Sequence, residues 1–370
     1  MPLKRILVRL PGAKLGDFLM TTPALAGLRE TYPNARITLL LWPPEPGAWL
    51  EGHPLFDEML WDDQEGAYSG TGGALRLLAR IRAHQFDAAV SLYGGGRYAW
   101  LFRLANIPLR VGCTRKSYGR LFTHNFPDNR SAPDRHEVEY NFDMMRPLGV
   151  SGAPGPMVYP VTAAEDSQAI RLLAERGWDG APFVIVNPTH GGSSRLWPPE
   201  RFAAASRQIV AETGARLALI GVPMDREGNA RIAVGIGPGT LDLTGDTSVG
   251  VLGAILRRSA LHLSVDTGTA HLAAAMGVPC VTVFPASQYW DERIRWSPWM
   301  TETRVLGPTV RCTSCRLYDC NRAQTACIDS IAPEAVARAA MELLAAGPTT
   351  RSVHRVIVPA HKKQDHTTKK

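Results

Sequence analysis

The chain alternates short apolar segments with helical ones, and this alternation constrains its fold more than any other feature. In the first half we expect strands at 5–10, 36–41 and 86–92, and helices at 17–28 and 74–84. The strands are continuously apolar, which is typical of parallel sheets covered by helices on both faces. The pattern therefore predicts an α/β fold.

The alternation restarts after a segment rich in glycine and proline, 151–160 (SGAPGPMVYP), which is the expected linker. Beyond it we expect strands at 183–187, 216–220, 240–243, 261–265 and 280–284, and helices at 163–176, 199–213, 226–234, 249–257, 269–276 and 333–344. A chain of 370 residues also exceeds the size at which a single core keeps growing. We predict two Rossmann-like lobes with a cleft between them, residues 1–160 and 161–346, followed by a basic disordered tail at 347–370.

The charge of the chain is unevenly distributed. The formal net charge is +7, but the last twenty residues hold six Lys and Arg and one Asp, which leaves the body at about +2. A global nucleic-acid interface thus loses its main support. Residues 88–127 contain six Arg and Lys and no Asp or Glu, and this local excess predicts an anionic partner. A solvated basic face without a partner is the alternative.

Targeting signals and membrane spans are not apparent. Arg9 interrupts the first apolar segment before it reaches the length of a signal peptide core. The most apolar stretch, 261–284, is broken by Asp266 and His271. We therefore expect a cytoplasmic protein.

The first candidate site, Gly16 and Asp17, follows the first expected strand. The surrounding loop matches neither a dinucleotide fingerprint nor a Walker loop. A carboxylate at the carboxyl edge of a parallel sheet can act as a general base. Asp is also a common helix cap, so the residues alone leave both roles open.

The second candidate site is the segment 264–271 (SVDTGTAH), where a strand ends and a helix begins. Backbone N–H groups and the helix dipole at such a point favour an anion. Thr267, Gly268 and Thr269 permit close approach and add hydroxyl groups, which suits a diphosphate. Alternatively, Asp266 caps the helix and His271 is a buried core residue.

A third loop, 189–198, carries Thr189, Ser193 and Arg195 after another strand. Because a guanidinium matches the geometry of phosphate, this loop is a candidate second phosphate contact. The sequence contains no D-x-D motif of the kind that holds a divalent cation on a nucleotide sugar. We therefore predict transfer without a metal or other cofactor, with helix termini, hydroxyls and Arg195 stabilising the departing diphosphate.

These motifs together resemble glycosyltransferase family 9, the ADP-heptose:lipopolysaccharide heptosyltransferases, over roughly residues 4–346. The similarity is carried by Gly16-Asp17, by 21–25 (TTPAL), by His136-Glu137 with Asn141, and by 197–202 (WPPERF) with the Asp266 segment. The resemblance implies a GT-B fold, with the acceptor in the N-terminal lobe, the donor in the C-terminal lobe, and inversion at the anomeric carbon.

The resemblance also implies roles for individual residues. Asp17 is expected to be the general base, and Arg195, where many members have Lys, is expected to act electrostatically. Asp225 stands where members often carry a Glu that contacts the nucleoside, so the nucleotide preference can differ. We assign donor binding to Gly16, Thr189, Ser193, Asp225, Asp266, Thr267, Gly268, Thr269 and His271, and acceptor binding to Arg97, Arg115, Lys116 and Arg120.

A cysteine cluster near the end of the chain, Cys312, Cys315, Cys320 and Cys327, resembles a pattern seen in many family members. Its spacing fits a structural zinc or iron–sulfur site, while reduced thiols or disulfide pairing are the alternatives. In none of these cases do we expect it to take part in the chemistry.

The expected partners are a nucleotide-diphosphate sugar and an anionic glycan or glycolipid acceptor. The basic segment and the cationic tail also suggest peripheral contact with the inner membrane. Two alternatives stay open: a related transferase that uses another nucleotide sugar, and a non-catalytic nucleotide-sugar-binding protein. A nicotinamide dehydrogenase is disfavoured because no G-x-G-x-x-G follows an expected strand.

Overall fold

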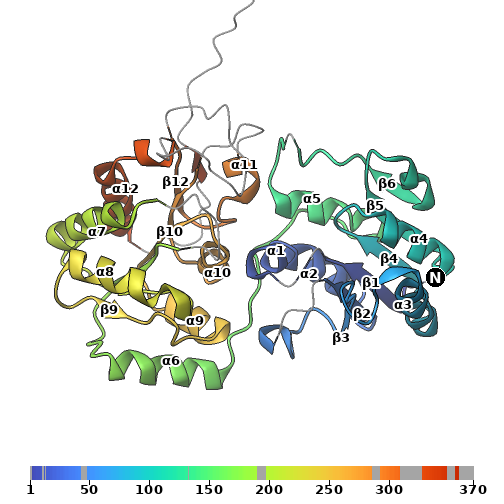
Figure 1. The fold of residues 1–370 in the computed structure, drawn as a ribbon, viewed down its shortest axis with the longest axis horizontal. Coiled ribbons are helices and arrows are strands. Elements are labelled where there is room, and N and C mark those ends of the chain that lie inside the picture. The colour runs from blue at the N-terminus through green and yellow to red at the C-terminus, as the bar shows by residue number, and fades with distance from the viewer. Residues whose placement is uncertain are drawn as a thin grey trace, which may run out of the picture. The chain divides into compact units, whose positions relative to one another are not determined.

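A computed structural model describes residues 2–10, 12, 14–42, 48–131, 133–189, 197–285, 292–308, 327–347 and 355–357. The chain divides into two compact units (Figure 1). The N-terminal unit comprises Met1–Thr162 with Ser248–Gly250, and the C-terminal unit comprises Ala163–Thr247 with Val251–Lys370. Each unit is built on one parallel sheet.

The sheet of the N-terminal unit has the strand order β3-β2-β1-β4-β5-β6, and every neighbouring pair is parallel. Its strands are β1 Arg5–Arg9, β2 Arg36–Leu41, β3 Glu58–Trp61, β4 Ala88–Ser91, β5 Leu109–Cys113 and β6 His124–Phe126. The three strands expected from the sequence, β1, β2 and β4, are confirmed. The other three carry polar or charged residues within the strand, so their apolar signal is weak.

Helices cover both faces of this sheet. On one face, α3 (Gly70–His84) and α4 (Gly96–Leu104) pack through Leu77, Ile81 and Phe102. On the other, α2 (Thr22–Thr31) and α5 (Glu137–Asp143) form a separate core. These two buried clusters explain why the strands are apolar on both sides.

The helix expected at 17–28 is broken into α1 (Leu15–Leu19) and α2. Pro23 lacks the N–H that would bond to the carbonyl of Leu19. Instead, the Thr22 hydroxyl donates to that carbonyl at 2.7 Å, and the Thr21 hydroxyl donates to the carbonyl of Asp17 at 2.9 Å. The break places Asp17 in a short helix of one turn directly after β1.

The sheet of the C-terminal unit has the order β13-β12-β11-β10-β7-β8-β9 and is also parallel. Its strands are β7 Phe183–Asn187, β8 Arg216–Leu219, β9 Leu241–Asp242, β10 Leu261–Val265, β11 Cys280–Val283, β12 Thr303–Leu306 and β13 Arg355–Ile357. Its helices are α6 Ala163–Glu175, α7 Pro199–Thr213, α8 Arg226–Ile236, α9 Val249–Leu256, α10 Gly268–Ala275, α11 Glu292–Trp296 and α12 Pro333–Ala346.

One further short strand follows these elements. β13, Arg355–Ile357, pairs in parallel with β12. The remainder of the predicted tail from residue 348 onward lies outside the described residues.

Candidate active site

The parallel strands of the N-terminal unit bring several polar segments to one edge of the sheet. The Asp17 segment follows β1, a glycine turn at 94–96 follows β4, and Arg115 with Lys116 follows β5. Because β4 lies between β1 and β5, these segments follow neighbouring strand ends. Ligand sites of open α/β sheets form at this carboxyl edge.

Asp17 is half-buried and is the third residue of α1. Lys14 occupies the N-cap position and makes no side-chain cap bond, and Asp17 is the acidic residue of the first turn. The neighbouring Gly16 is also half-buried, and its carbonyl accepts from the N–H of Met20 at 3.0 Å. The general-base role of Asp17 stays a prediction.

A buried network that the sequence analysis missed holds the end of α1. Arg130 donates through Nε to both carboxylate oxygens of Glu137 at 2.8 and 3.1 Å, and through Nη2 to Asn141 at 3.2 Å. Asn141 in turn donates to the carbonyl of Met20 at 3.3 Å. Glu137 and Asn141 are fully buried, and Arg130 is 7% exposed. The network therefore fixes the backbone three residues after Asp17.

The two aromatic rings next to Arg130 complete its surroundings. Its guanidinium carbon lies 4.7 Å from the ring centre of Tyr93 and 5.1 Å from that of Tyr140. A buried ion pair needs such additional contacts, because desolvation otherwise outweighs the attraction. The signal in the sequence was the spacing of Glu137 and Asn141, which puts both on one side of a helix.

Arg97, one of the predicted acceptor-binding cations, forms an ion pair, and its role toward the acceptor stays a prediction. Its guanidinium donates to both oxygens of Asp62 at 3.0 and 2.9 Å and to the Tyr68 carbonyl at 3.0 Å. The Asp62 side chain is fully buried, so Arg97 neutralises a carboxylate that water cannot reach. A structural role for Arg97 accounts for these contacts.

The other three predicted acceptor-binding cations are exposed. Arg115 donates to the Asp128 carbonyl at 3.1 Å and also to the Asn129 side chain. Lys116 and Arg120 lie at the two ends of the short 3₁₀ helix η2 (Ser117–Leu121). All three thus present positive charge on the segment that connects β5 with β6.

In the C-terminal unit, the predicted diphosphate site lies between β10 and α10. Thr267 is the N-cap of α10 and makes no side-chain cap bond, and Asp266, Thr267 and Gly268 are half-buried. The first N–H groups of a helix lack partners within it and carry a partial positive charge. This helix end can therefore bind phosphate oxygens.

Asn187, the last residue of β7, links three of the segments predicted to bind the donor. Its amide nitrogen donates to the Thr269 hydroxyl at 2.8 Å, and its oxygen accepts from the Thr189 N–H at 3.2 Å. The Thr189 hydroxyl lies 2.8 Å from Oδ2 of Asp225, to which it donates. Since β7 lies between β10 and β8, one buried side chain connects three adjacent strand ends. The sequence analysis did not single out Asn187.

Asp225 is positioned by the turn that follows β8. Its Oδ2 also accepts from the N–H of Val222 at 2.8 Å. A Cβ atom at Gly221 would lie 2.8 Å from this same oxygen, so the position requires glycine. Asp225 is therefore held against the Thr189 loop.

Two buried histidines flank the start of α10. Nε2 of His262 lies 3.1 Å from the Thr269 hydroxyl, which is thus held by both His262 and Asn187. Burial lowers the pKa of His262 to about 3 and that of His271 to about 4, so both are neutral near pH 7. Nδ1 of His271 is buried without a hydrogen-bond partner among the described residues.

Several predicted residues lie outside the described part of the chain. These are Ser193, Arg195, Cys312, Cys315 and Cys320. Cys327, the remaining cysteine of the cluster, is half-buried. Among the described residues, no group of three or more His, Cys, Asp or Glu is arranged to hold a metal ion. No helix in the described ranges combines the length and apolar character needed to cross a bilayer.

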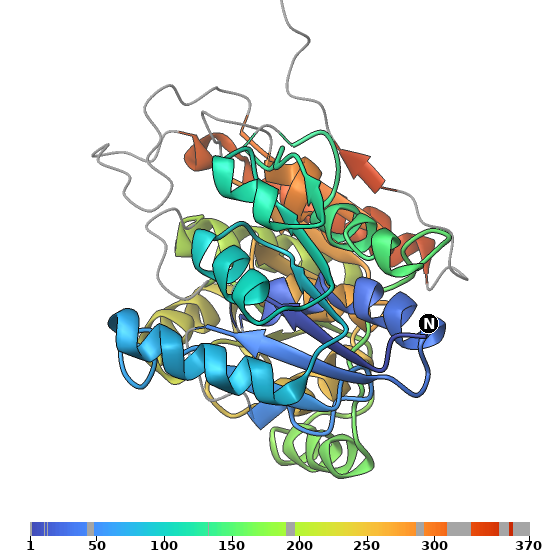
Figure 2. The same cartoon turned by 90° about the vertical axis from the view of Figure 1, so that its right-hand side faces the viewer.

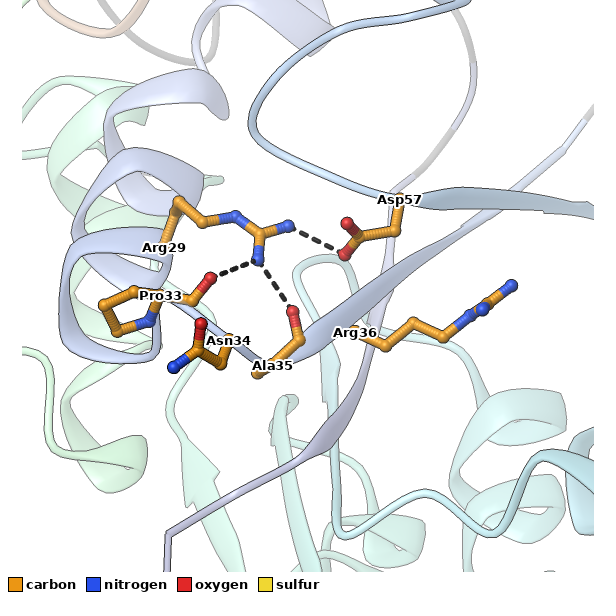
Figure 3. A pocket seen from close by; sticks show the side chains of 6 residues that line it. All are labelled: Arg29, Pro33, Asn34, Ala35, Arg36 and Asp57. Carbon is orange, nitrogen blue, oxygen red and sulfur yellow. Dashed lines mark hydrogen bonds and ion pairs between the residues drawn. The ribbon is translucent and has the colours of Figure 1, made fainter.

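A surface depression lies at the opposite, amino end of β2 (Figure 3). Arg29 crosses it and donates to the Pro33 and Ala35 carbonyls and, at 2.7 Å, to Asp57. These contacts hold the turn that leads into β2. The depression therefore does not belong to the Asp17 edge of the sheet.

Comparisons with known proteins show a likeness at the level of family and fold. The family model of glycosyltransferase family 9 (heptosyltransferase) matches residues 74–325. Lipopolysaccharide heptosyltransferase 3 of Escherichia coli is 28% identical over 295 residues, covering 77% of this chain and 83% of that protein.

Solved structures show the same likeness. A glycosyl transferase family 9 structure from Veillonella parvula aligns with a TM-score of 0.74 at 22% identity, covering 93% of this chain and 97% of the other. The Escherichia coli ADP-heptose lps heptosyltransferase II aligns with a TM-score of 0.68 at 20% identity, covering 92% and 99%. The likeness confirms the predicted GT-B fold of two parallel-sheet α/β units.

Proposed function

Because the chain belongs to glycosyltransferase family 9, the heptosyltransferase family, we propose that it transfers a heptose from ADP-heptose to a lipopolysaccharide core acceptor. The chain is a glycosyltransferase. The donor sugar, the inverting course and the independence from metal are the parts of this proposal that go beyond the family.

The part of the proposal that concerns donor binding rests above all on one observation. Hydrogen bonds connect Asn187 with Thr189 and Thr269 at adjacent strand ends. They hold the Asp225 turn and the start of α10 in fixed positions beside each other. In this proposal the backbone N–H groups at Gly268 and Thr269 bind the diphosphate, and Asp225 contacts the nucleoside. The Thr269 hydroxyl positions the helix end, because it is already held from two sides.

The chemical step is a single displacement. An acceptor hydroxyl loses its proton to the carboxylate of Asp17 while its oxygen forms a bond to the anomeric carbon of the heptose. The bond between that carbon and the diphosphate oxygen breaks, and ADP departs with the electron pair. Attack opposite the leaving group inverts the anomeric configuration.

The departing diphosphate carries negative charge, and the C-terminal unit stabilises this charge with oriented dipoles. The α10 N-terminus supplies N–H donors whose orientation is fixed before the reaction. Arg195, assigned from the sequence, adds a positive charge. The absence of a D-x-D motif supports departure without a divalent cation.

The part of the proposal that concerns acceptor binding rests on Arg115, Lys116 and Arg120. These exposed residues follow β5 in the unit that carries Asp17. Cations at this edge suit the phosphate and carboxylate groups of an anionic glycan. We place the reaction at the cytoplasmic face of the inner membrane, where such a lipid-linked acceptor is built.

The test combines donor screening with product analysis. ADP-, GDP- and UDP-linked sugars are titrated by calorimetry, and the tightest donor is incubated with a deacylated core oligosaccharide. We expect ADP-heptose to bind best, the product to gain one heptose by mass spectrometry, and its anomeric configuration by NMR to be inverted. EDTA should leave the rate unchanged.

The nucleotide screen matters because Asp225 is shorter than the Glu that many members carry at this position. Transfer from a different nucleotide sugar, with ADP-heptose inactive, rejects the donor assignment and leaves the glycosyltransferase assignment intact. A product with retained configuration rejects the single displacement. Loss of activity in EDTA, restored by Mg²⁺, rejects the metal-independent departure.

A further inference from the structure

The outer surface of the α3–α4 layer exposes large apolar side chains. Leu75 on α3 is 60% exposed, and Trp100 and Leu104 on α4 are 53% and 45% exposed. Trp100 and Leu104 are four residues apart, so they lie on one side of α4. The two helices lie side by side on one face of the sheet (Figures 1 and 2). Single exposed apolar residues are common, whereas three on two adjoining helices point to a function for this surface.

The same two helices carry only positive charge. α3 holds Arg76, Arg80 and Arg82, α4 holds Arg97 and Arg103, and neither helix contains Asp or Glu. Arg82 reaches across to α4 and donates to the Leu104 carbonyl at 2.7 Å. Arg82 of α3 therefore lies beside Leu104 of α4.

This patch adjoins the predicted acceptor-binding segment. Helix α4 packs against η2, and a Cβ atom at Gly96 would lie 3.5 Å from the Tyr118 ring. Lys116 and Arg120 at the ends of η2 are exposed. The helix that carries Trp100 and Leu104 thus packs against the segment that carries the acceptor-side cations.

We propose that this surface, Leu75, Arg80, Trp100, Arg103 and Leu104, docks the enzyme on an anionic lipid bilayer. The inference rests on the proposed function, in which the acceptor is lipid-linked. Trp and Leu suit the boundary between headgroups and acyl chains, and arginines bind anionic headgroups while their stems lie along the apolar region. Docking there would hold η2 close to the headgroup level.

A bilayer fits this surface better than a second copy of the chain does. In a two-fold dimer the same patch contributes to both sides of the interface. The arginines of α3 and α4 would then lie within one interface, and neither helix carries a carboxylate to pair with them. An anionic membrane supplies the opposite charge.

The first experiment measures binding of the full chain to vesicles by co-sedimentation, comparing phosphatidylcholine alone with a mixture containing phosphatidylglycerol. We expect binding only to the anionic vesicles. The double variant Arg80→Gln with Arg103→Gln should bind roughly 20- to 30-fold more weakly. Trp100→Ser with Leu104→Ser should weaken binding by about tenfold or more.

Matched controls come from the C-terminal unit. Ile170 and Val234 are exposed apolar residues at 46% and 85%, and Arg171 and Arg231 are exposed cations. Ile170→Ser with Val234→Ser, and Arg171→Gln with Arg231→Gln, should leave vesicle binding within about twofold of the parent. Equal losses in patch and control variants would reject the proposed surface.

A second measurement needs no variant. Hydrogen exchange of the parent protein on anionic vesicles should show new protection within 70–104 and 116–121. Absence of vesicle binding, protection elsewhere, or a dimer that Trp100→Ser with Leu104→Ser converts to monomer without changing vesicle binding would each overturn the inference. Turnover on a deacylated, soluble acceptor should be unchanged in the patch variants. Failure of that transfer in the parent instead counts against the proposed function.

Discussion

The two units share a parallel-sheet design, yet their carboxyl edges are built from different chemistry. In the N-terminal unit the edge relies on buried charge, with Arg130 paired to Glu137 and Arg97 to Asp62. In the C-terminal unit the corresponding edge relies on hydrogen bonds among Asn187, Thr269 and the uncharged His262, and on the Asp225 carboxylate, which accepts from Thr189 and Val222. The first edge is held by ion pairs, and the second by hydrogen bonds.

The difference follows from what each edge has to hold in the proposed reaction. A donor diphosphate brings its own negative charge, and oriented N–H groups can stabilise it without a buried counter-ion. A carboxylate base instead needs a backbone that does not move, and the Arg130 network fixes the chain just after Asp17. The following expectations test this contrast, from the largest effect to the smallest.

Asp17→Asn should produce the largest loss. We expect kcat to fall by about 10²- to 10⁴-fold, because the amide cannot accept the proton of the acceptor hydroxyl. The donor dissociation constant, measured by calorimetry, should change little. A variant with normal turnover would end the assignment of Asp17 as the base.

Glu137→Gln should destabilise the N-terminal unit by about 3–5 kcal/mol, because Arg130 would keep a buried charge without a counter-ion. Urea unfolding followed by circular dichroism measures this loss. The control is Glu58→Gln, whose half-exposed carboxylate pairs with Arg36 and His84 and should contribute less than about 1 kcal/mol. Similar losses in both variants would contradict the special role of buried charge.

A triple variant reverses the charge of the three exposed cations through Arg115→Glu, Lys116→Glu and Arg120→Glu. Its KM for the acceptor should rise by tenfold or more, while its KM for the donor should stay unchanged. Arg97→Ala should behave differently and lower stability, since it leaves Asp62 buried and unpaired. Equal changes in both KM values would argue against acceptor binding at this edge.

Asn187→Ala should weaken donor binding by about tenfold, because the helix end and the Thr189 loop each lose a hydrogen bond that holds them. Calorimetric titration with the donor measures the change, and the acceptor KM should stay near the parent value. Unaltered donor affinity would remove Asn187 from the proposed site.

The buried histidines predict a pH dependence of stability. Their pKa values in the folded protein, about 3 for His262 and about 4 for His271, lie below the ordinary value of 6.5. Between pH 6.5 and 4 the unfolded chain therefore binds more protons, and stability falls as pH falls by about 1.4 kcal/mol per pH unit for each histidine. His271→Gln should reduce this slope by one such contribution in urea unfolding at several pH values. An identical slope would show that His271 titrates normally.

Local patterns in the sequence predicted a large part of the fold. The strands β2, β7 and β10 and the helix α7 begin and end at the predicted residues, because each is a strongly apolar or periodic segment with clear flanks. Helix α4 and strand β5 were not predicted. Arg97, Arg103 and Arg110 interrupt their apolar pattern, although Asn106 and Pro108 between them are turn signals.

The sequence by itself determined the two series of alternating strands and helices and the carboxylate after the first strand. It also determined the helix N-terminus after β10, which is suited to binding phosphate. It also contained the signal for the break between α1 and α2, because Pro23 removes one N–H from the helix. All of these depend on residues that are near neighbours in the chain.

Only the tertiary structure decided which polar groups meet. Asn141 reaches the Met20 carbonyl across 121 positions of sequence, and Asn187 reaches Thr269 across 82. Sheet order brings such residues together, as when β10 and β8 pair on either side of β7. Spacing along the chain carries no record of that order, so it could not show that Arg97 neutralises Asp62 or that Asn187 links the donor-side segments.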